Sequence, residues 1–489
     1  MAKKIRQEVP RDRKERLVNG QVHELQVHSF DGVGCGRSTL AERPVAVSGA
    51  LPGETVRARI THVGQRTIAA GTVEVITPSP DRVAPHSCPP GCDACPFIPL
   101  RYEAQLAWKE RLVRGALHAY PSFRQVPVRP ILPSPRETGY RTVAKLVVGG
   151  TWARPRLGVY RRHSHQVVDL VACPLHHPLI NRVVAAVREG IRAVKMPVYH
   201  PKSDQGILRY LVVRVAETSN EALAVFVTAE RNFNEVHHLA KHLQAAVPEV
   251  TVVAQNVNSS DGNVVLGPQD YFLTRRQALE ERMGTVRFTI SPRSFFQVNP
   301  GSAQLIYETV REWAALSGSE TVLDLYCGVG GIALFLAPKA REVIGIEAVG
   351  SAVADAVVNA RLNGIRTCHF REGDAARLLE ELRREGRHFD VAVLNPSRKG
   401  CEERVLAGVA AGSPEKILYV SCNPVALARD LETLAGLGYR TCEVQPVDMF
   451  PQTPHVECVA LLVREATAPV VRTDRAAGTP GRRAPAKGR

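Results

Sequence analysis

The alternation of apolar and polar residues changes along the chain and predicts three kinds of structure. Short alternating runs broken by glycine, such as VAVSGALPGETVRARI, fill residues 17–78 and predict a small β-barrel. Residues 79–290 mix strand-like segments with helical patterns near 178–194 and 233–246, which indicates a mixed α/β domain. From 291 to 465, short apolar strands alternate with helical segments, the pattern of a doubly wound parallel sheet with a Rossmann-like fold. The sequence therefore predicts an α/β protein with three folded domains.

Two polar tails flank this folded region. Residues 1–16 and 466–489 have too little apolar surface to order themselves, so we expect both to be disordered. The formal net charge of the chain is +15, and the two tails hold +4 and +5 of it. Basic tails on a soluble protein are typical of contact with nucleic-acid phosphates, although a purely solubilising tail has the same composition.

The overall composition excludes several classes of protein. Of the 489 residues, 44% are apolar and 23% are charged, which is ordinary for soluble globular domains and unlike fibrous or wholly disordered chains. No stretch reaches the ~20 apolar residues that a spanning helix needs. The charged start, MAKKIRQEVP, lacks the apolar segment of a signal peptide. We expect a cytoplasmic protein without a membrane partner, and a monomer.

The segment VLDLYCGVGG carries the strongest local signal for a ligand site. A predicted strand ends at Asp324, a glycine-rich turn follows with Gly328 and Gly331, and a helix begins. The next strand ends in Glu347, whose carboxylate is placed to accept hydrogen bonds from ribose hydroxyls. The spacing is not the dinucleotide pattern GxGxxG, and it fits S-adenosylmethionine (SAM) better than NAD. A purely structural glycine turn is the alternative.

Polar residues also follow the other predicted strands of this sheet. Asp374, Asn395 and Cys422 each stand at a strand end, and ligands of open α/β sheets bind outside the carboxyl ends of the strands. A lone cysteine such as Cys422, in SCNP, is more often an inert small apolar residue than a nucleophile. Glu457, in MFPQTPHVE beside a late pair of strands, offers a carboxylate that would favour the catalytic interpretation.

A second group of cysteines indicates a metal site. Cys88, Cys92 and Cys95 have the spacing C-x3-C-x2-C, and Cys173 in LVACPLHHP is the natural fourth ligand. Cysteines this close in a cytosolic chain favour metal binding over a disulfide. Both zinc and an iron–sulfur cluster accept four thiolates, so the spacing leaves the metal open.

Four motifs in this order, SFFQVN, VLDLYCGVGG, SCNPVALARDL and DMFPQTPHVE, resemble the RNA 5-methyluridine methyltransferases. The resemblance spans residues 17–465, and the N-terminal part with GALPGETVRARI is similar to a TRAM domain. It implies a SAM-dependent RNA (uracil-C5) methyltransferase. It favours 23S rRNA as the substrate, because tRNA-specific bacterial members generally lack the barrel and the cysteines; a tRNA uridine is the alternative. It also implies a 4Fe–4S cluster at the four cysteines, with zinc as the alternative.

The same resemblance implies roles for individual residues. The Cys422 thiolate adds to C6 of uracil, which makes C5 nucleophilic toward the methyl group of SAM, and Glu457 then removes the C5 proton. The target uridine must leave its stack, and Phe295 is either the aromatic residue that stacks on it or a core residue. The cofactor SAM is assigned to Gln297, Tyr326, Gly331, Glu347, Asp374 and Asn395.

One position departs from the family pattern. Members normally have Asp-Pro-Pro-Arg where this chain has Asn395-Pro-Ser-Arg398, so a negative charge is replaced by a neutral amide. Two other functions stay open on this ground: a non-catalytic RNA-binding or ribosome-assembly factor, and an enzyme that methylates a base nitrogen. The presence of both Cys422 and Glu457 argues for the uracil-C5 enzyme, because neither alternative needs a thiol nucleophile.

Overall fold

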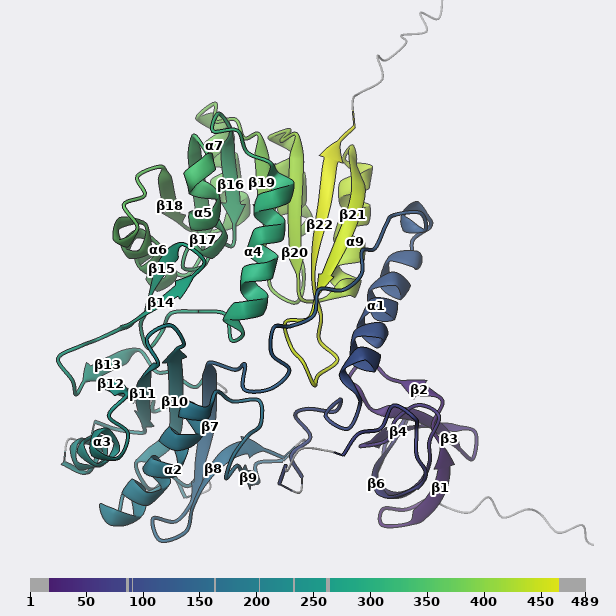
Figure 1. Cartoon of the computed structure of the whole chain (residues 1–489), viewed down its shortest axis with the longest axis vertical. Coiled ribbons are helices and arrows are strands. Elements are labelled where there is room, and N and C mark those ends of the chain that lie inside the picture. Colours follow the sequence, from purple (N-terminus) through teal and green to yellow (C-terminus); the bar gives the residue numbers. More distant parts are fainter. Residues whose placement is uncertain are drawn as a thin grey trace, which may run out of the picture.

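The computed structural model describes residues 17–465 apart from 85–87, 90, 162–163, 202, 232–233 and 261–263. The predictions for the tails, 1–16 and 466–489, lie outside the described residues. The described strands form three large β-sheets and one two-stranded sheet, and Figure 1 shows how the helices are arranged around them. Among the described residues, none of the helices is both long and apolar enough to cross a lipid bilayer.

The N-terminal sheet buries one face of each strand, as the alternating sequence predicts. Along β5 the buried residues are Val56, Ala58 and Ile60, which point inward at every second position and pack against Leu25 and Val47. The strands have the spatial order β1-β5-β6-β4-β3-β2. Their bounds are β1 (Val22–Gln26), β2 (Ser29–Phe30), β3 (Gly36–Leu40), β4 (Arg43–Ser48), β5 (Thr55–Val63) and β6 (Ile68–Thr77).

The middle sheet is buried on both faces. Adjacent residues of β10, Val212 and Val213, belong to two different hydrophobic cores: Val213 packs toward helices α2 and α3, and Val212 packs toward the C-terminal part of the chain. This explains the unbroken apolar runs of the sequence, because a strand covered on both sides has no solvent face. The helices α2 (Pro178–Ala193) and α3 (Asn234–Ala246) lie where the sequence predicts them.

The strand order in this sheet is β13-β12-β11-β10-β7-β8-β9 (Figure 1). The bounds are β7 (Val143–Gly150), β8 (Pro155–Tyr160), β9 (Val167–Asp169), β10 (Leu208–Ala216), β11 (Glu221–Thr228), β12 (Val250–Val257) and β13 (Gln269–Phe272). A separate hairpin, β14 (Leu279–Met283) and β15 (Val286–Ile290), follows and packs in the core that the middle and C-terminal sheets share.

The C-terminal sheet has the order β18-β17-β16-β19-β20-β22-β21, and its strands are parallel from β18 to β20. Strand β22 is antiparallel to both of its neighbours, β20 and β21, so one reversed strand lies between β20 and the edge strand β21, which runs in the direction of the parallel strands. The strand bounds are β16 (Thr321–Leu325), β17 (Glu342–Glu347), β18 (Cys368–Glu372), β19 (Val391–Leu394), β20 (Lys416–Ser421), β21 (Tyr439–Val447) and β22 (Glu457–Arg464).

Crossover helices connect these strands and cover the sheet, with α4 drawn in front of it in Figure 1. Their bounds are α4 (Pro300–Ala314), α5 (Gly331–Leu336), α6 (Gly350–Leu362), α7 (Ala375–Arg384), α8 (Glu403–Ala411) and α9 (Pro424–Gly436), with short 3-10 turns at Pro121–Phe123 and Ala337–Lys339. Because parallel strands end at the same edge, the last residues of β16, β17, β19 and β20 lie beside one another.

Helix α1 (Tyr102–His118) falls within the range that the sequence assigns to the middle domain, yet it packs on the C-terminal sheet. Val113 and Leu117 of α1 share a hydrophobic core with Leu427 and Leu431 of α9. The helix lies alongside the β21–β22 edge in Figure 1. The chain between the N-terminal and middle sheets thus makes contact with the C-terminal part of the molecule.

Candidate active site

A cleft with a volume of about 560 Å³ opens at the carboxyl ends of the C-terminal strands. It brings together residues that are far apart in the sequence, from the loop before α4 to the start of β22. Eight of the residues predicted from the sequence line it: Phe295, Gln297, Tyr326, Gly331, Glu347, Asn395, Cys422 and Glu457. Strand-end geometry therefore places the candidate nucleophile, the candidate base and most of the candidate cofactor residues in one cavity.

Asp374 is not among the described residues that line this cleft. Its side chain accepts a hydrogen bond from the backbone N–H of Arg377 (3.0 Å), which caps the first turn of α7, and it pairs with Arg404 at 3.3 Å. An aspartate three residues before a helical N–H is a common N-cap, and this local contact competes with a role toward a ligand.

The turn after β16 lines the cleft and has an unusual backbone. Tyr326, Gly328 and Gly330 all have positive φ values, of 62°, 56° and 83°. Such a value is costly for a bulky residue like tyrosine, and strained residues of this kind concentrate at functional sites. A Cβ atom at Gly331 would lie 2.5 Å from the hydroxyl of the buried Tyr307, so that position requires glycine.

Two carboxylates, those of Asp324 and Glu347, hold this turn and the start of α5 by hydrogen bonds. Asp324, at the end of β16, accepts the Ala333 N–H with one oxygen (3.0 Å), while its other oxygen is buried with no partner in the described part of the chain. Burial raises the pKa of Asp324 to about 7. Glu347 accepts the N–H groups of Gly328 (3.1 Å) and Val349 (2.9 Å), which fixes its carboxylate at the cleft.

Cys422 stands between β20 and α9, where the chain turns sharply. The side chain of Asn423 caps α9 by accepting the Val425 N–H and also donates to the backbone oxygen of Arg398, so the turn is held on both sides. Cys422 is half-buried. Burial and the nearby carboxyl group of Glu457 raise the pKa of its thiol, whereas the charge of Arg398 and a hydrogen bond from it lower that pKa.

Glu457 lies deep in the same cleft at the first residue of β22. Its backbone pairs with Val447 of β21, which fixes its position relative to the end of the sheet. Burial raises the pKa of Glu457 to about 8, and Arg398 opposes this shift. A carboxyl group with a pKa near the pH of the cell is suited to general acid–base catalysis.

Comparison with known proteins agrees with this arrangement. The family model described as tRNA (Uracil-5-)-methyltransferase matches residues 202–465. The chain is 59% identical over 448 residues to an uncharacterized RNA methyltransferase of Geobacter sulfurreducens, which covers 91% of this chain and 90% of the relative. It is 36% identical to an uncharacterized RNA methyltransferase of Halalkalibacterium halodurans, over 90% of this chain and 96% of the relative.

The chain belongs to the tRNA (uracil-5-)-methyltransferase family. Its structure is also similar to the crystal structure of Pyrococcus abyssi tRNA (uracil-54, C5)-methyltransferase in complex with S-adenosyl-L-homocysteine, with a TM-score of 0.74 and 28% identity. The match covers 90% of this chain and 99% of the Pyrococcus chain. The α/β methyltransferase fold predicted from the sequence is therefore confirmed.

The structure adds cleft residues that the sequence motifs did not single out, among them Tyr307, Arg398 and Phe450 of this methyltransferase. Tyr307, from α4, hydrogen-bonds the side chain of Gln297, and burial raises its pKa. Arg398 is the last residue of NPSR, the segment that directly follows β19, so its position in the sequence could have marked it as a cleft residue. Phe450 lies within the motif DMFPQTPHVE, where only Glu457 was assigned a role, whereas Tyr307 lies outside the motifs and tertiary packing brings it to the cleft.

Phe295 and its neighbour Phe296 have opposite environments. Phe296 is buried, packs against Phe288 and belongs to the core, whereas 66% of Phe295 is exposed at the rim of the cleft. The core interpretation therefore applies to Phe296. Stacking of Phe295 on a base stays a prediction, and its exposure is what that prediction needs.

The four cysteines of the predicted metal site also lie together. Cys88, Cys92, Cys95 and Cys173 line a small cavity of about 40 Å³ with Arg141. Burial raises the pKa of Cys88 to about 11 and of Cys95 to about 12. Within the described ranges, no group of three or more His, Cys, Asp or Glu side chains is arranged to hold a metal ion. The thiols share a cavity, but their arrangement is not that of a single-ion site.

Proposed function

We propose that this protein methylates C5 of a uridine in RNA, with SAM as the methyl donor, through a covalent adduct between Cys422 and uracil C6. The observation that carries the proposal is the common cleft of Cys422 and Glu457, with Arg398 acting on the pKa of both groups in a member of this family. The pair supplies a nucleophile and a base, which are the two groups that this reaction requires of the protein.

The chain's own residues account for the order of events. Cys422, as a thiolate favoured by Arg398, adds to C6, and the ring electrons make C5 nucleophilic. SAM supplies the methyl group that C5 accepts. Glu457 then takes the C5 proton, the C5–H electrons form the C5=C6 bond, and the C6–sulfur bond breaks to return the thiolate.

The other end of the cleft suits the cofactor. This part of the cleft is lined by Gly331 and by the strained turn at Tyr326. The carboxylate of Glu347 is held beside that turn by the Gly328 N–H and can accept hydrogen bonds from ribose hydroxyls. The Pyrococcus enzyme was solved with S-adenosyl-L-homocysteine, the product form of SAM, and its fold matches this one. We assign Gln297, Tyr326, Gly331, Glu347 and Asn395 to the SAM half of the cleft, with Asp374 outside its lining.

The proposed RNA is 23S rRNA, and tRNA is the competing substrate. The structure of the Pyrococcus tRNA (uracil-54, C5)-methyltransferase matches 90% of this chain, so the N-terminal sheet alone does not separate the two substrates. The four cysteines and the TRAM-like N-terminal sheet support the rRNA assignment through the family resemblance. The basic tails supply a phosphate-binding charge that suits either RNA.

We also propose that the four cysteines hold a 4Fe–4S cluster. Tetrahedral zinc holds each sulfur at about 2.3 Å, and the described thiols do not form such a single-ion site. Arg141 lines the same cavity, and its buried Nε has no hydrogen-bond partner among the described residues. An anionic cluster would satisfy that cation, so the donor set and the charge fit the group.

The experiment that tests the function maps 5-methyluridine in the RNA of cells with and without the gene. We expect one or more positions in 23S rRNA to lose the modification, and purified protein to restore it on an unmodified 23S rRNA transcript. Loss at a tRNA position instead would identify the competing substrate. Unchanged 5-methyluridine in both RNAs would favour the non-catalytic factor, and full activity of Cys422→Ala would favour methylation of a base nitrogen.

A further inference from the structure

Helix α1 presents a buried polar face to the loop between β21 and β22. Tyr102, Gln105 and Lys109 recur at intervals of three and four residues, so they lie on one side of the helix. Gln105 and Lys109 are fully buried, which is rare for such side chains unless they are paired. All three side chains have a partner within residues 448–455, which we call the catalytic-base loop because it leads into Glu457, and Gln105 also donates to the backbone oxygens of Phe97 and Leu100.

Lys109 and Asp448 form the centre of this contact. The Lys109 ammonium donates to the Asp448 carboxylate at 2.6 Å and to the backbone oxygen of Phe450 at 3.0 Å. Asp448 also accepts the Tyr102 hydroxyl (2.8 Å) and the Phe450 N–H (3.2 Å). Both backbone groups of Phe450, a residue that lines the cleft, are therefore held by one buried ion pair.

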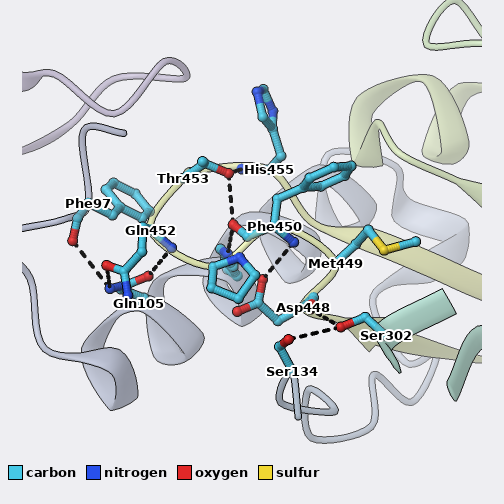
Figure 2. A network of polar contacts seen from close by, with 12 residues as sticks. Phe97, Gln105, Ser134, Ser302, Asp448, Met449, Phe450, Gln452, Thr453 and His455 are labelled. Atoms are coloured by element: carbon cyan, nitrogen blue, oxygen red, sulfur yellow. Dashed lines mark hydrogen bonds and ion pairs between the residues drawn. The ribbon is translucent and has the colours of Figure 1, made fainter. Parts of the chain in front are cut away.

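A second pair of contacts holds the tip of the loop (Figure 2). The Gln105 and Gln452 side chains join at 2.9 Å, and the Gln105 oxygen accepts the Gln452 N–H at 2.8 Å. The N–H of Phe97, two residues after Cys95, donates to the Gln452 oxygen at 3.1 Å. Gln452 has a positive φ of 68°, a conformation that persists only where its surroundings enforce it.

Stability alone is a weak reason for a buried ion pair, because removing two charges from water costs about as much as their attraction returns. Burial lowers the pKa of Lys109, and the Asp448 carboxylate opposes that shift. What the pair does fix is geometry. Asp448 directly follows Val447, the backbone partner of Glu457, so the ion pair lies one residue from the strand pairing that positions the base.

We propose that Lys109 and Asp448 are positioning residues for Glu457, and that they act on release of the methylated uridine from Cys422. This inference rests on the proposed function. Cys422 is positioned by the turn between β20 and α9, and the glycine-rich turn after β16 is held by Asp324 and Glu347. The chain that leads into Glu457, in contrast, is held by the contacts of the catalytic-base loop. Loosening the loop should slow removal of the C5 proton, and the methylated uracil then stays bound to the Cys422 sulfur.

The test uses the full chain with tritiated SAM and unmodified 23S rRNA and tRNA transcripts. Lys109→Met should raise the fraction of protein in an SDS-stable, methyl-labelled RNA adduct several-fold. Its kcat should fall about tenfold or more, with little change in KM. Lys109→Met leaves the Asp448 carboxylate buried without its ion-pair partner, which can destabilise the protein. The double variant Lys109→Met/Asp448→Asn removes both charges, and it should show the same rise in adduct without an uncompensated buried charge.

The matched control is Lys416→Met, since Lys416 is a partly buried lysine that donates to the Ala314 backbone at the far end of β20. It should behave as the wild type. Wild-type turnover and adduct level in a folded Lys109→Met or double variant would overturn the inference, as would a rise in KM with no added adduct. If the wild-type protein methylates neither transcript, the proposed function itself fails. This result does not depend on the variants, so it is distinct from a failure of the inference about Lys109 and Asp448.

Discussion

The guanidinium of Arg398 hydrogen-bonds the thiol of Cys422. The same cation lowers the pKa of Glu457 and of His455, so its charge acts on three titratable groups, Cys422, His455 and Glu457. Burial brings the pKa of His455 down to about 4, which leaves that imidazole uncharged at neutral pH. Arg398 is thus placed to favour the charged forms of both the proposed nucleophile, Cys422, and the proposed base, Glu457.

Replacing Arg398 with methionine should therefore slow addition of Cys422 to uracil. Loss of an opposite charge at this distance raises a thiol pKa by about one unit or more, which lowers the thiolate fraction about tenfold at neutral pH. We expect alkylation of Cys422 by iodoacetamide and the methylation rate to fall together, and to recover as the pH rises. Arg384→Met, on the exposed side of α7, is the control. A pH profile identical to that of the wild type would contradict this role.

Glu457→Gln should trap the enzyme on its substrate. Without the carboxylate the C5 proton is not removed, so the methylated adduct should form at a near-normal rate and decay about 100-fold more slowly. In the wild type, the pKa near 8 means that the carboxylate is the minor form at pH 7. Adduct decay should accelerate with pH up to about 8 and level off above it, as measured by quenched single-turnover reactions. Rapid release from Glu457→Gln would show that another group is the base.

Gly331→Ala should weaken SAM binding more than it weakens folding. The added methyl group meets the Tyr307 hydroxyl at 2.5 Å and pushes Tyr307 off its hydrogen bond with Gln297. Overpacking of this kind costs about 1–3 kcal/mol, and a loss of that size in the free energy of SAM binding lowers the affinity by about fivefold to 150-fold. Calorimetric titration with SAM measures it. The double variant Gly331→Ala/Tyr307→Phe removes the clashing oxygen and should recover part of the affinity; no recovery would contradict the steric explanation.

The sequence predicted those parts of the site that depend on local pattern. Strand ends gave Glu347, Asn395 and Cys422, because parallel strands carry their last residues to a common edge. Asp374 satisfied the same pattern, and its side chain caps α7, a contact made within three residues; its contact with SAM stays a prediction. Adjacent phenylalanines were ambiguous for a related reason: alternation does not tell which of Phe295 and Phe296 points into the core.

Contacts that cross the chain were beyond any such pattern. Lys109 donates to Asp448, from which it is separated by 339 positions in the sequence. Tyr307 enters the cleft from a helix that carries no motif. Both placements depend on how α1 and α4 pack on the C-terminal sheet, and that packing is a property of the whole fold rather than of any segment.

Asn395 is the position where this chain departs from its family, and its effect is testable directly. Asn395 directly follows β19, lines the cleft and donates its backbone N–H to the Leu325 oxygen at 3.2 Å, a contact that does not depend on its side chain. Asparagine keeps a carbonyl acceptor but lacks the family's negative charge. We expect Asn395→Asp to leave kcat/KM for the transcript equal or higher, and Asn395→Ala to lower it, because alanine removes the acceptor as well. A complete loss of activity in Asn395→Asp would mean that this residue does not occupy the position of the family aspartate.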